Sequence, residues 1–461
     1  MNSCFNAQGE VFLQRLSGVL AIVARSLYEH RRLAAREAKS LRSSGPDLET
    51  KLKKPLPKLL FYGDVGPTST FAGPLQLHRI LSPYPPERLL LVYPGAATRQ
   101  DIPGARYMEP AAPWWLPLWH RRGGKHLLLL MSALGWVVWR FDPKAPRWLS
   151  KAACEFGAEA ILTVGMAGAW MASAQVARRR GIPLHVVVHD HRHYCAVFPN
   201  FAQAFVERWF GSVYRSAASR LLTSRPMERK YFEMFGAHGI VLNPTRGPDT
   251  PHFDSPPRRL EEEGGLTRVV YAGSVWGDRL LRILTELGDQ LRHRGMRLIA
   301  YFSNNVERSA RVSESIEVRP AVPSAEVVET LREHADILLH CSSFEASSRD
   351  VVATLFPSKL VDYSATALPV FVFAPEYSSA ADLCREYPDA FAFTSSPEPA
   401  QIADRLFELA QNPTRAIALG RANSRVGRRL FDPASGYSKL TSALVAGADP
   451  KRGEGDWDSP A

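Results

Sequence analysis

Cysteine is scarce in this 461-residue chain, and no cysteine has the spacing of a metal or redox motif. The five cysteines are scattered, odd in number and include no CxxC pair. This pattern argues against a disulfide-stabilised scaffold and against a structural zinc site, and it favours a reducing compartment. The five are Cys4, Cys154, Cys195, Cys341 and Cys384.

Long apolar runs are also lacking. No stretch reaches the roughly 18 to 20 continuous apolar residues that a bilayer-spanning helix needs. The nearest candidate, residues 127–139 (LLLLMSALGWVVW), is too short and is flanked by basic residues. The N-terminus lacks the small-residue cleavage site of a signal peptide. We therefore expect a cytoplasmic protein.

Positive charge is in excess, with 57 Lys and Arg against 46 Asp and Glu and a formal net charge of +11. Such an excess attracts nucleic acid, phosphorylated ligands or an anionic membrane surface. The chain has no zinc finger, no RNP-type aromatic pattern and no basic heptad region, so we expect no nucleic-acid partner. A phosphate-bearing ligand and an anionic membrane both stay open.

Two segments bear on the membrane question. Residues 10–40 have apolar side chains at helical spacing followed by a basic run, which predicts an amphipathic helix. The stretch Trp114–Arg140 combines tryptophans, arginines and a leucine-rich core. Each segment suits peripheral contact with the inner face of a membrane, and each equally suits a helix packed against the protein body.

Short apolar runs alternate with helical stretches in two separate parts of the chain, which predicts two parallel α/β sheets. The expected strands are residues 58–62, 89–92, 160–164, 184–188 and 220–223, then 268–272, 297–301, 316–319, 337–339 and 370–373.

These runs give an α/β fold class with two Rossmann-like domains and a cleft between them. The predicted parts are an N-terminal amphipathic helix and linker (1–57), a first domain (58–245), a proline-rich linker (246–266), a second domain (267–430) and a C-terminal helix and tail (431–461).

Ligands of parallel α/β sheets bind beyond the carboxyl ends of the strands, so the residues that follow each strand are the candidates for a site. The loop with Gly63, Gly66 and Ser69 follows the first strand, and its glycines allow close approach of a ligand or simply a tight turn. His189 and Asp190 follow the fourth strand. With His191 and His193 they suit an active site, a metal site or a loop without a role, although three histidines so close in sequence wrap a tetrahedral ion poorly.

In the second domain, Gly273 and Ser274 follow the first strand, and Arg279 lies in the next helical stretch. An anion that approaches this helix would meet small residues and a basic side chain. The alternative is that Arg279 is an ordinary surface arginine. The segment Phe356–Val370 places Ser358 and Lys359 at the start of a helix. Their hydroxyl, ammonium and main-chain amides predict a clamp for a diphosphate.

The segment PSKLVDYSATALPVFVF (357–373) resembles the PSK segment of GT-B glycosyltransferases of the large GT4-like group (glycosyl transferases group 1). The following APEYSSAADLCRE (374–386) is also similar to that group. Shorter pieces such as YAGS (271–274) and IPLHVVVHD (182–190) fall in the group's order, and the resemblance spans roughly residues 58–446.

This resemblance implies an enzyme that transfers a sugar from a nucleotide-sugar donor to a glycan or lipid-linked acceptor, in polysaccharide or glycolipid biosynthesis. It implies a hexosyltransferase-like reaction with no metal and no cofactor besides the donor substrate. Residues that match the group's donor-binding positions are Gly63, Gly66, Ser69, Gly273, Ser274, Arg279, Ser358, Lys359 and Asp362. His189, with Asp190, matches the group's first-domain histidine near the acceptor.

The chain departs from the group at three positions. Many members have a Glu-x7-Glu pair, and Thr354 and Asp362 stand where those two glutamates would be. Ala367 replaces the usual glycine. Two alternatives therefore remain: a sugar-nucleotide epimerase or hydrolase on the same fold, and a catalytically degenerate partner protein.

Overall fold

The computed structural model describes residues 55–69, 72–98, 100–110, 144–196, 198, 200–258, 260, 267–275, 277–303 and 310–447. The expected helix over residues 10–40, the stretch Trp114–Arg140 and the tail after residue 447 lie outside these described residues.

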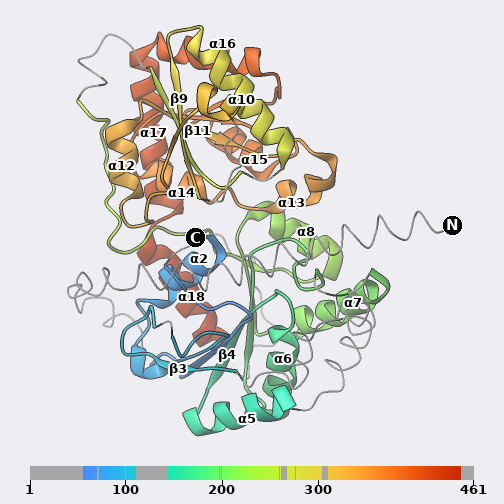
Figure 1. Cartoon of the computed structure of the whole chain (residues 1–461). Helices are drawn as coiled ribbons and strands as arrows, with labels where there is room; N and C mark the ends of the chain where they lie inside the picture. Colours follow the sequence, from blue (N-terminus) through green and yellow to red (C-terminus); the bar gives the residue numbers. More distant parts are fainter. Residues whose placement is uncertain are drawn as a thin grey trace, which may run out of the picture. The chain divides into compact units, whose positions relative to one another are not determined.

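The first domain is built on a seven-stranded sheet in the order β3-β2-β1-β4-β5-β6-β7, and all of its neighbouring strands are parallel (Figure 1). Its strands are β1 (Leu59–Tyr62), β2 (Leu89–Val92), β3 (Arg106–Met108), β4 (Ala160–Val164), β5 (Leu184–Val188), β6 (Ser219–Leu222) and β7 (Ile240–Val241). Its helices are α2 (Ala72–Leu81), α5 (Lys144–Phe156), α6 (Ala169–Arg180), α7 (Asn200–Ser216) and α8 (Arg225–Phe235).

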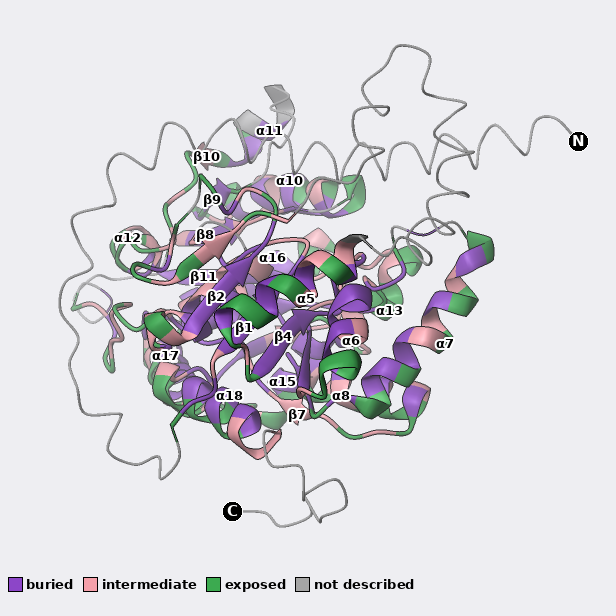
Figure 2. Ribbon diagram, turned by 90° about the horizontal axis from the view of Figure 1, so that it is seen from below, coloured by how far each residue is buried: buried purple, intermediate pink, exposed green. Residues whose placement is uncertain are grey.

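Side chains that alternate along the first sheet separate two hydrophobic cores. On β1, Leu60 and Tyr62 pack against α5 to α8, whereas Leu59 and Phe61 face α2 and the last helix, α18 (Pro433–Gly447). Because successive side chains of a strand point to opposite faces, each strand supplies both cores. Figure 2 shows the result, with buried strands between helices whose outer faces are exposed. Helix α18 follows the second domain in sequence and yet completes the first.

The second domain contains a six-stranded sheet in the order β10-β9-β8-β11-β12-β13, which repeats the strand order of the first sheet. Its strands are β8 (Arg268–Gly273), β9 (Arg297–Phe302), β10 (Glu317–Arg319), β11 (Ile337–Cys341), β12 (Val370–Phe373) and β13 (Ala392–Thr394). Its helices are α10 (Asp278–Arg292), α11 (Ala310–Ser315), α12 (Val327–His334), α13 (Arg349–Thr354), α14 (Lys359–Ser364), α15 (Ser379–Glu386), α16 (Pro399–Ala410) and α17 (Pro413–Leu430).

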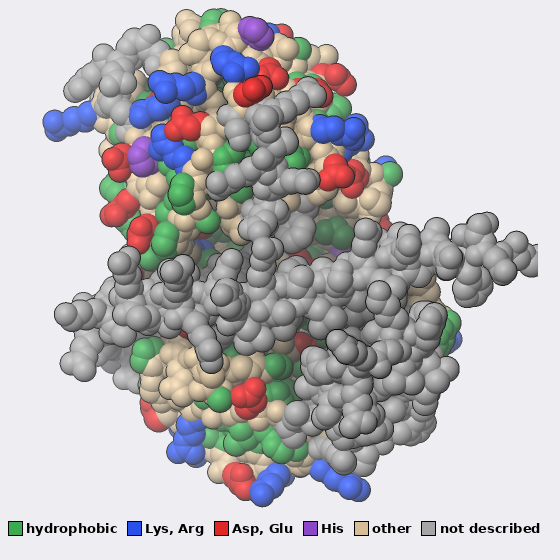
Figure 3. All heavy atoms as spheres, viewed as in Figure 1, with side chains coloured by type: hydrophobic (Ala, Val, Ile, Leu, Met, Phe, Trp, Pro, Cys, Tyr) green, Lys and Arg blue, Asp and Glu red, His purple; other side chains and the backbone are tan. Residues whose placement is uncertain are grey.

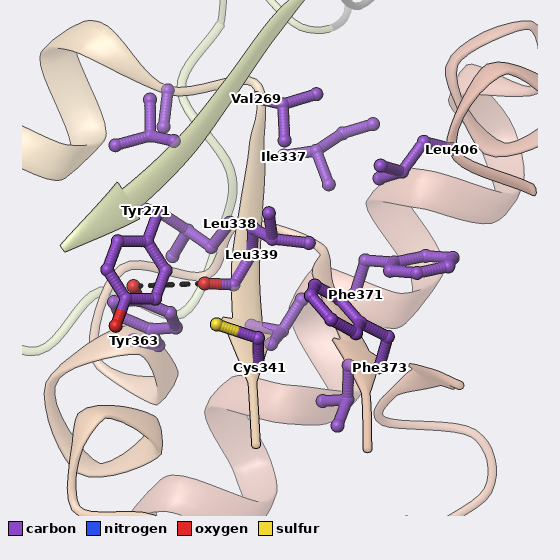
Figure 4. Close-up of a cluster of buried hydrophobic side chains, with 14 of the residues drawn as sticks. Val269, Tyr271, Ile337, Leu338, Leu339, Cys341, Tyr363, Phe371, Phe373 and Leu406 are labelled. Carbon is purple, nitrogen blue, oxygen red and sulfur yellow. Dashed lines mark hydrogen bonds between the residues drawn. The ribbon is translucent and has the colours of Figure 1, made fainter. Parts of the chain in front are cut away.

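The main core of the second domain is a cluster of strand and helix side chains (Figure 4). Leu406 of α16 packs there with Val269, Ile337 and Phe371 from three neighbouring strands. The Tyr363 hydroxyl, on α14, donates to the main-chain carbonyl of Leu339 at 3.2 Å. This bond satisfies a polar group inside an apolar cluster and ties α14 to β11.

The strands that the sequence predicts are all present, which confirms the two parallel sheets of the expected fold class. The sequence did not reveal β3, β7 and β13, which are two or three residues long and lie at sheet edges. Edge strands have one neighbour and shorter apolar runs, so their hydrophobic signal is weak.

Basic and acidic side chains are interspersed on the described part of the face drawn in Figure 3. The positive excess of the sequence is therefore not gathered into one patch on that part of the surface.

Candidate functional site

The ammonium group of Lys359 lies at the carboxyl end of strand β8. Lys359 is the first residue of α14, and its Nζ donates to the Tyr271 hydroxyl at 2.7 Å and to the main-chain carbonyl of Ser274 at 3.2 Å. Nζ also lies 4.5 Å from the centroid of the Tyr271 ring. These partners are all neutral, so the half-buried cation is oriented without being neutralised, which suits it to bind an anion.

Burial lowers the pKa of Lys359 below its usual value, while the neighbouring Cys341 thiol opposes that shift. Burial raises the pKa of Cys341 to about 11, so this thiol stays protonated near neutral pH. A bound anion beside Lys359 would favour the charged ammonium and raise its pKa again.

Gly273 makes room for the Lys359 side chain. A Cβ atom at this position would lie 2.2 Å from Cε of Lys359, and Gly273 has a φ of 131°, which L residues rarely adopt. The lysine can therefore reach the strand end only because residue 273 has no side chain.

Three other predicted residues lie in the same part of the second domain. Ser274 shares a hydrogen bond of 2.8 Å with the hydroxyl of Ser303, which follows β9. Ser358 immediately precedes α14, is half-buried and makes no capping hydrogen bond with its hydroxyl. Arg279, in the first turn of α10, donates to the main-chain carbonyl of Phe344 at 3.3 Å. The structure thus gathers Gly273, Ser274 and Lys359 at one strand end and directs Arg279 toward the loop after β11.

Asp362 pairs with an arginine of the first domain. Its Oδ1 accepts from the guanidinium of Arg79, on α2 of the first domain, at 3.0 Å. The Arg79 side chain is only 4% exposed and that of Asp362 is 19% exposed. The carboxylate is therefore engaged in a largely buried ion pair.

The glycine loop of the first domain packs tightly against protein atoms. A Cβ at Gly66 would lie 2.3 Å from the buried ring of Tyr93, and a Cβ at Gly63 would lie 2.7 Å from the Phe61 ring. The carbonyl of Ser69 accepts from the Ser324 hydroxyl of the second domain at 2.8 Å. The two glycines thus have a packing role in the loop, which reaches the second domain through Ser69.

Asp64, between these glycines, caps helix α6. Its Oδ2 accepts from the main-chain amides of Gly168 and Ala169 at 3.0 and 2.9 Å. Burial raises the pKa of Asp64 to about 6, and the amides oppose the shift. A carboxylate at a helix N-terminus accepts hydrogen bonds from the free amides and interacts favourably with the positive end of the helix dipole.

His189 and Asp190 lie next to each other after β5. The Nε2 atom of His189 is buried and has no hydrogen-bond partner among the described residues, and burial lowers the pKa of the ring. A Cβ at Gly73, near the start of α2, would lie 4.0 Å from Cγ of His189. Asp190 lies 3.3 Å from Nδ1 of His193. Burial therefore favours the neutral imidazole of His189, whereas Asp190 has a partner.

The other histidines of this loop have separate surroundings. His191 packs edge-on against Tyr231, with ring centroids 6.1 Å apart, and is buried. The described residues include no group of three side chains placed to hold a metal ion. Within the same residues, no helix is long and apolar enough to cross a bilayer.

Sequence reasoning missed Tyr271, Ser303 and Arg79. Tyr271 lies in an apolar strand, where a tyrosine is expected in the core, and the sequence does not reveal that its hydroxyl meets a lysine 88 residues away. Arg79 and Asp362 are 283 residues apart, so only the tertiary fold brings them together.

Known structures with the same arrangement include a glycosyltransferase and a protein crystallised with a nucleotide sugar. HepE of Anabaena in complex with UDP-glucose is 12% identical, has a TM-score of 0.57, and the match covers 84% of this chain and 99% of that chain. A glycosyltransferase from Rickettsia africae is 11% identical with a TM-score of 0.56, and sucrose-phosphate synthase from Thermosynechococcus elongatus is 12% identical with a TM-score of 0.54. Each of these two matches covers 84% of this chain and 98% of the other.

No protein-family model and no curated protein sequence matches the chain. At identities this low, structural likeness establishes the fold and not the activity. The two parallel-sheet domains give this chain the GT-B fold, as the sequence predicts.

Proposed function

We propose that this protein is a glycosyltransferase that takes a sugar from a nucleotide-sugar donor. The observation that supports it best is the half-buried ammonium of Lys359, which is held by neutral groups at the carboxyl end of β8 in a GT-B fold. Ligands of doubly wound sheets bind at this edge, next to the point where the strand order reverses, and β8 and β11 flank that point here.

In this proposal the donor diphosphate lies against Gly273, Ser274, Ser358 and Lys359, with Arg279 nearby. Transfer breaks the bond between the anomeric carbon and the diphosphate oxygen and forms a bond from that carbon to an acceptor hydroxyl, which loses its proton. The ammonium of Lys359 stabilises the charge that develops on the leaving diphosphate. That role needs no metal ion.

The first domain would supply the acceptor side. His189 is neutral because burial lowers its pKa, so its ring can accept a hydrogen bond from a hydroxyl or take its proton. Asp190 would orient nearby groups, and the loop with Gly63, Gly66 and Ser69 would face the donor from this domain. This loop packs closely against Phe61 and Tyr93.

We infer a GT4-like enzyme that acts on a glycan or lipid-linked acceptor in polysaccharide or glycolipid biosynthesis. The support is the PSK segment at residues 357–373 and HepE, which was crystallised with UDP-glucose. A cytoplasmic protein in peripheral contact with the inner membrane face fits the same role. Fractionation of cell lysates before and after a high-salt wash tests that location.

Calorimetry with UDP, GDP and ADP tests the donor proposal. We expect one nucleotide to bind in the presence of EDTA, and we expect Lys359→Ala to weaken that binding about 30-fold or more, because it removes a charge-assisted contact. Lys439→Ala is the matched control. Lys439 lies on α18, and its ammonium also donates to a main-chain carbonyl, that of Val241. Absence of binding by the wild type would favour the degenerate-partner alternative.

The epimerase or hydrolase alternative needs free carboxylates for acid and base work. Asp64 instead caps α6, and Asp190 lies against His193. Turnover of a nucleotide sugar with inverted sugar stereochemistry and no acceptor would nevertheless favour that alternative.

A further inference from the structure

The Arg79–Asp362 ion pair joins the two sheet domains close to the candidate donor site. The guanidinium of Arg79 belongs to the last turn of α2 and is nearly fully buried. A buried charge is stable only when its hydrogen-bond donors are satisfied, so both of its contacts matter.

The second contact of Arg79 is with Thr245, the last residue of the first domain. Its Nη1 donates to the carbonyl of Thr245 at 2.9 Å, and the amide of Thr245 donates to Gln76 Oε1 at 3.0 Å. A Cβ at Gly436 of α18 would lie 2.3 Å from Cγ2 of Thr245, so this residue is enclosed from another side as well. Arg79 therefore binds a fixed point of the first domain and α14 at the same time.

The two helices that this pair links begin at the two halves of the candidate site. Helix α2 starts shortly after the loop Gly63–Ser69, and α14 starts with Lys359. Asp362 is three residues after Lys359, one helical turn along α14. Any shift of α14 relative to α2 therefore moves the ammonium relative to the first-domain loop.

The other position of the usual carboxylate pair also contacts the first domain. The carbonyl of Thr354 accepts from the Ser224 hydroxyl, at the N-terminus of α8, at 2.7 Å. Both positions at which this chain departs from the Glu-x7-Glu pattern thus have partners across the domains.

We propose that Arg79 and Asp362 are positioning residues that fix helix α2 relative to helix α14. In this proposal Asp362 acts through Arg79 and does not touch the donor. This inference rests on the proposed glycosyltransferase function. It predicts that donor turnover depends on the ion pair while binding of a bare nucleotide to the second domain does not.

The test compares Asp362→Asn, Arg79→Met and the double variant. We expect each variant to bind UDP, or whichever nucleotide the wild type binds, within about threefold of the wild-type affinity. We expect kcat for donor hydrolysis or transfer to fall about tenfold or more in each single variant, because a small misplacement of the reacting groups is costly. The double variant should be no slower than the slower single variant, since both changes remove one interaction.

Arg225→Met is the matched control. Arg225 also forms an ion pair across the domains, with Glu386 at 3.3 Å, but its side chain is 74% exposed. We expect its turnover to stay within about twofold of wild type, because exposed ion pairs contribute little. Circular dichroism verifies folding, and if Arg79→Met does not fold, Arg79→Lys replaces it with an expected intermediate loss of kcat.

Two outcomes would overturn the inference. If Asp362→Asn loses nucleotide affinity at least tenfold while Arg79→Met keeps it, Asp362 contacts the donor directly. If the single variants turn over at the wild-type rate, the ion pair positions nothing. A wild type that binds no nucleotide is a different result, because it refutes the proposed function itself and, with it, any positioning of a donor.

Discussion

The two domains share the order of their first six strands and have glycines where the first strand ends, yet the glycines of each domain make room for different partners. In the first domain, Gly63 and Gly66 allow the aromatic rings of Phe61 and Tyr93 to pack against the loop. In the second, Gly273 allows the aliphatic chain of Lys359 to cross the strand end. A glycine at this point of a Rossmann-like fold is therefore not evidence of a ligand by itself. The side chain that occupies the space next to it indicates its role.

The largest expected effect falls on the packed loop of the first domain. Gly66→Ala places a methyl group 2.3 Å from a buried tyrosine ring, and we expect the free energy of unfolding to fall by about 3 kcal/mol. Denaturant unfolding measures the loss. Gly73→Ala is the control, because Gly73 lies in helix α2 and the nearest atom to its added Cβ is 4.0 Å away. We expect the free energy of unfolding of this variant to be unchanged or slightly raised. Equal stability of both variants would contradict the packing role of Gly66.

The next effect concerns the acidic cap of the same loop. The folded-state pKa of Asp64, about 6, lies above the usual unfolded value, so folding favours its protonated form. The wild type therefore loses stability as the pH rises from 4 through 6. The expected loss is roughly 2 kcal/mol relative to Asp64→Asn, which keeps an oxygen acceptor but does not titrate. Urea unfolding at pH 4 to 7 measures it. A difference between the two proteins that is constant with pH would show that Asp64 is not shifted.

In the second domain the corresponding glycine should affect binding. Gly273→Ala would displace Lys359, whose flexible end can move, and we expect nucleotide affinity to fall about tenfold, or 1.4 kcal/mol. Gly295→Ala is the matched control, because it has a φ of 73° and no atom within 4 Å of the added Cβ. Both variants suffer backbone strain, but only the first should bind nucleotide more weakly in calorimetry. If both lose affinity equally, the loss comes from strain and not from Lys359.

The smallest effect is at Ala367, where the resembling group has glycine. Ala367 is buried and has a φ of 56°, so glycine would relieve strain but remove a buried methyl group. These terms nearly cancel, and we expect Ala367→Gly to change stability by less than about 1 kcal/mol. Ala403→Gly, at a buried position inside α16, should cost about 2 kcal/mol in the same thermal unfolding assay. A loss at Ala367 as large as at Ala403 would mean that its backbone is not strained.

The sequence was sufficient to predict the central strands of both sheets, because fully buried strands such as Leu184–Val188 and Val370–Phe373 are apolar runs between helices. It also placed Gly273, Ser274 and Lys359 at the end of a strand or the start of a helix, where the structure brings them together. The direction in which a side chain points could not be predicted from the sequence. The Tyr271 hydroxyl turns toward Lys359 and the Asp362 carboxylate toward Arg79 because of tertiary packing, which local periodicity does not encode.

The return of α18 to the first domain has a consequence for biosynthesis. Tyr437, Leu440 and Leu444 of this helix cover the sheet face that includes Leu59 and Phe61. A ribosome makes these strands early and the covering helix some 370 residues later, so one hydrophobic face of the first sheet stays uncovered while the entire second domain is being translated. A nascent chain stalled before residue 433 should therefore recruit chaperones through its first domain, even though its second domain has all of its strands.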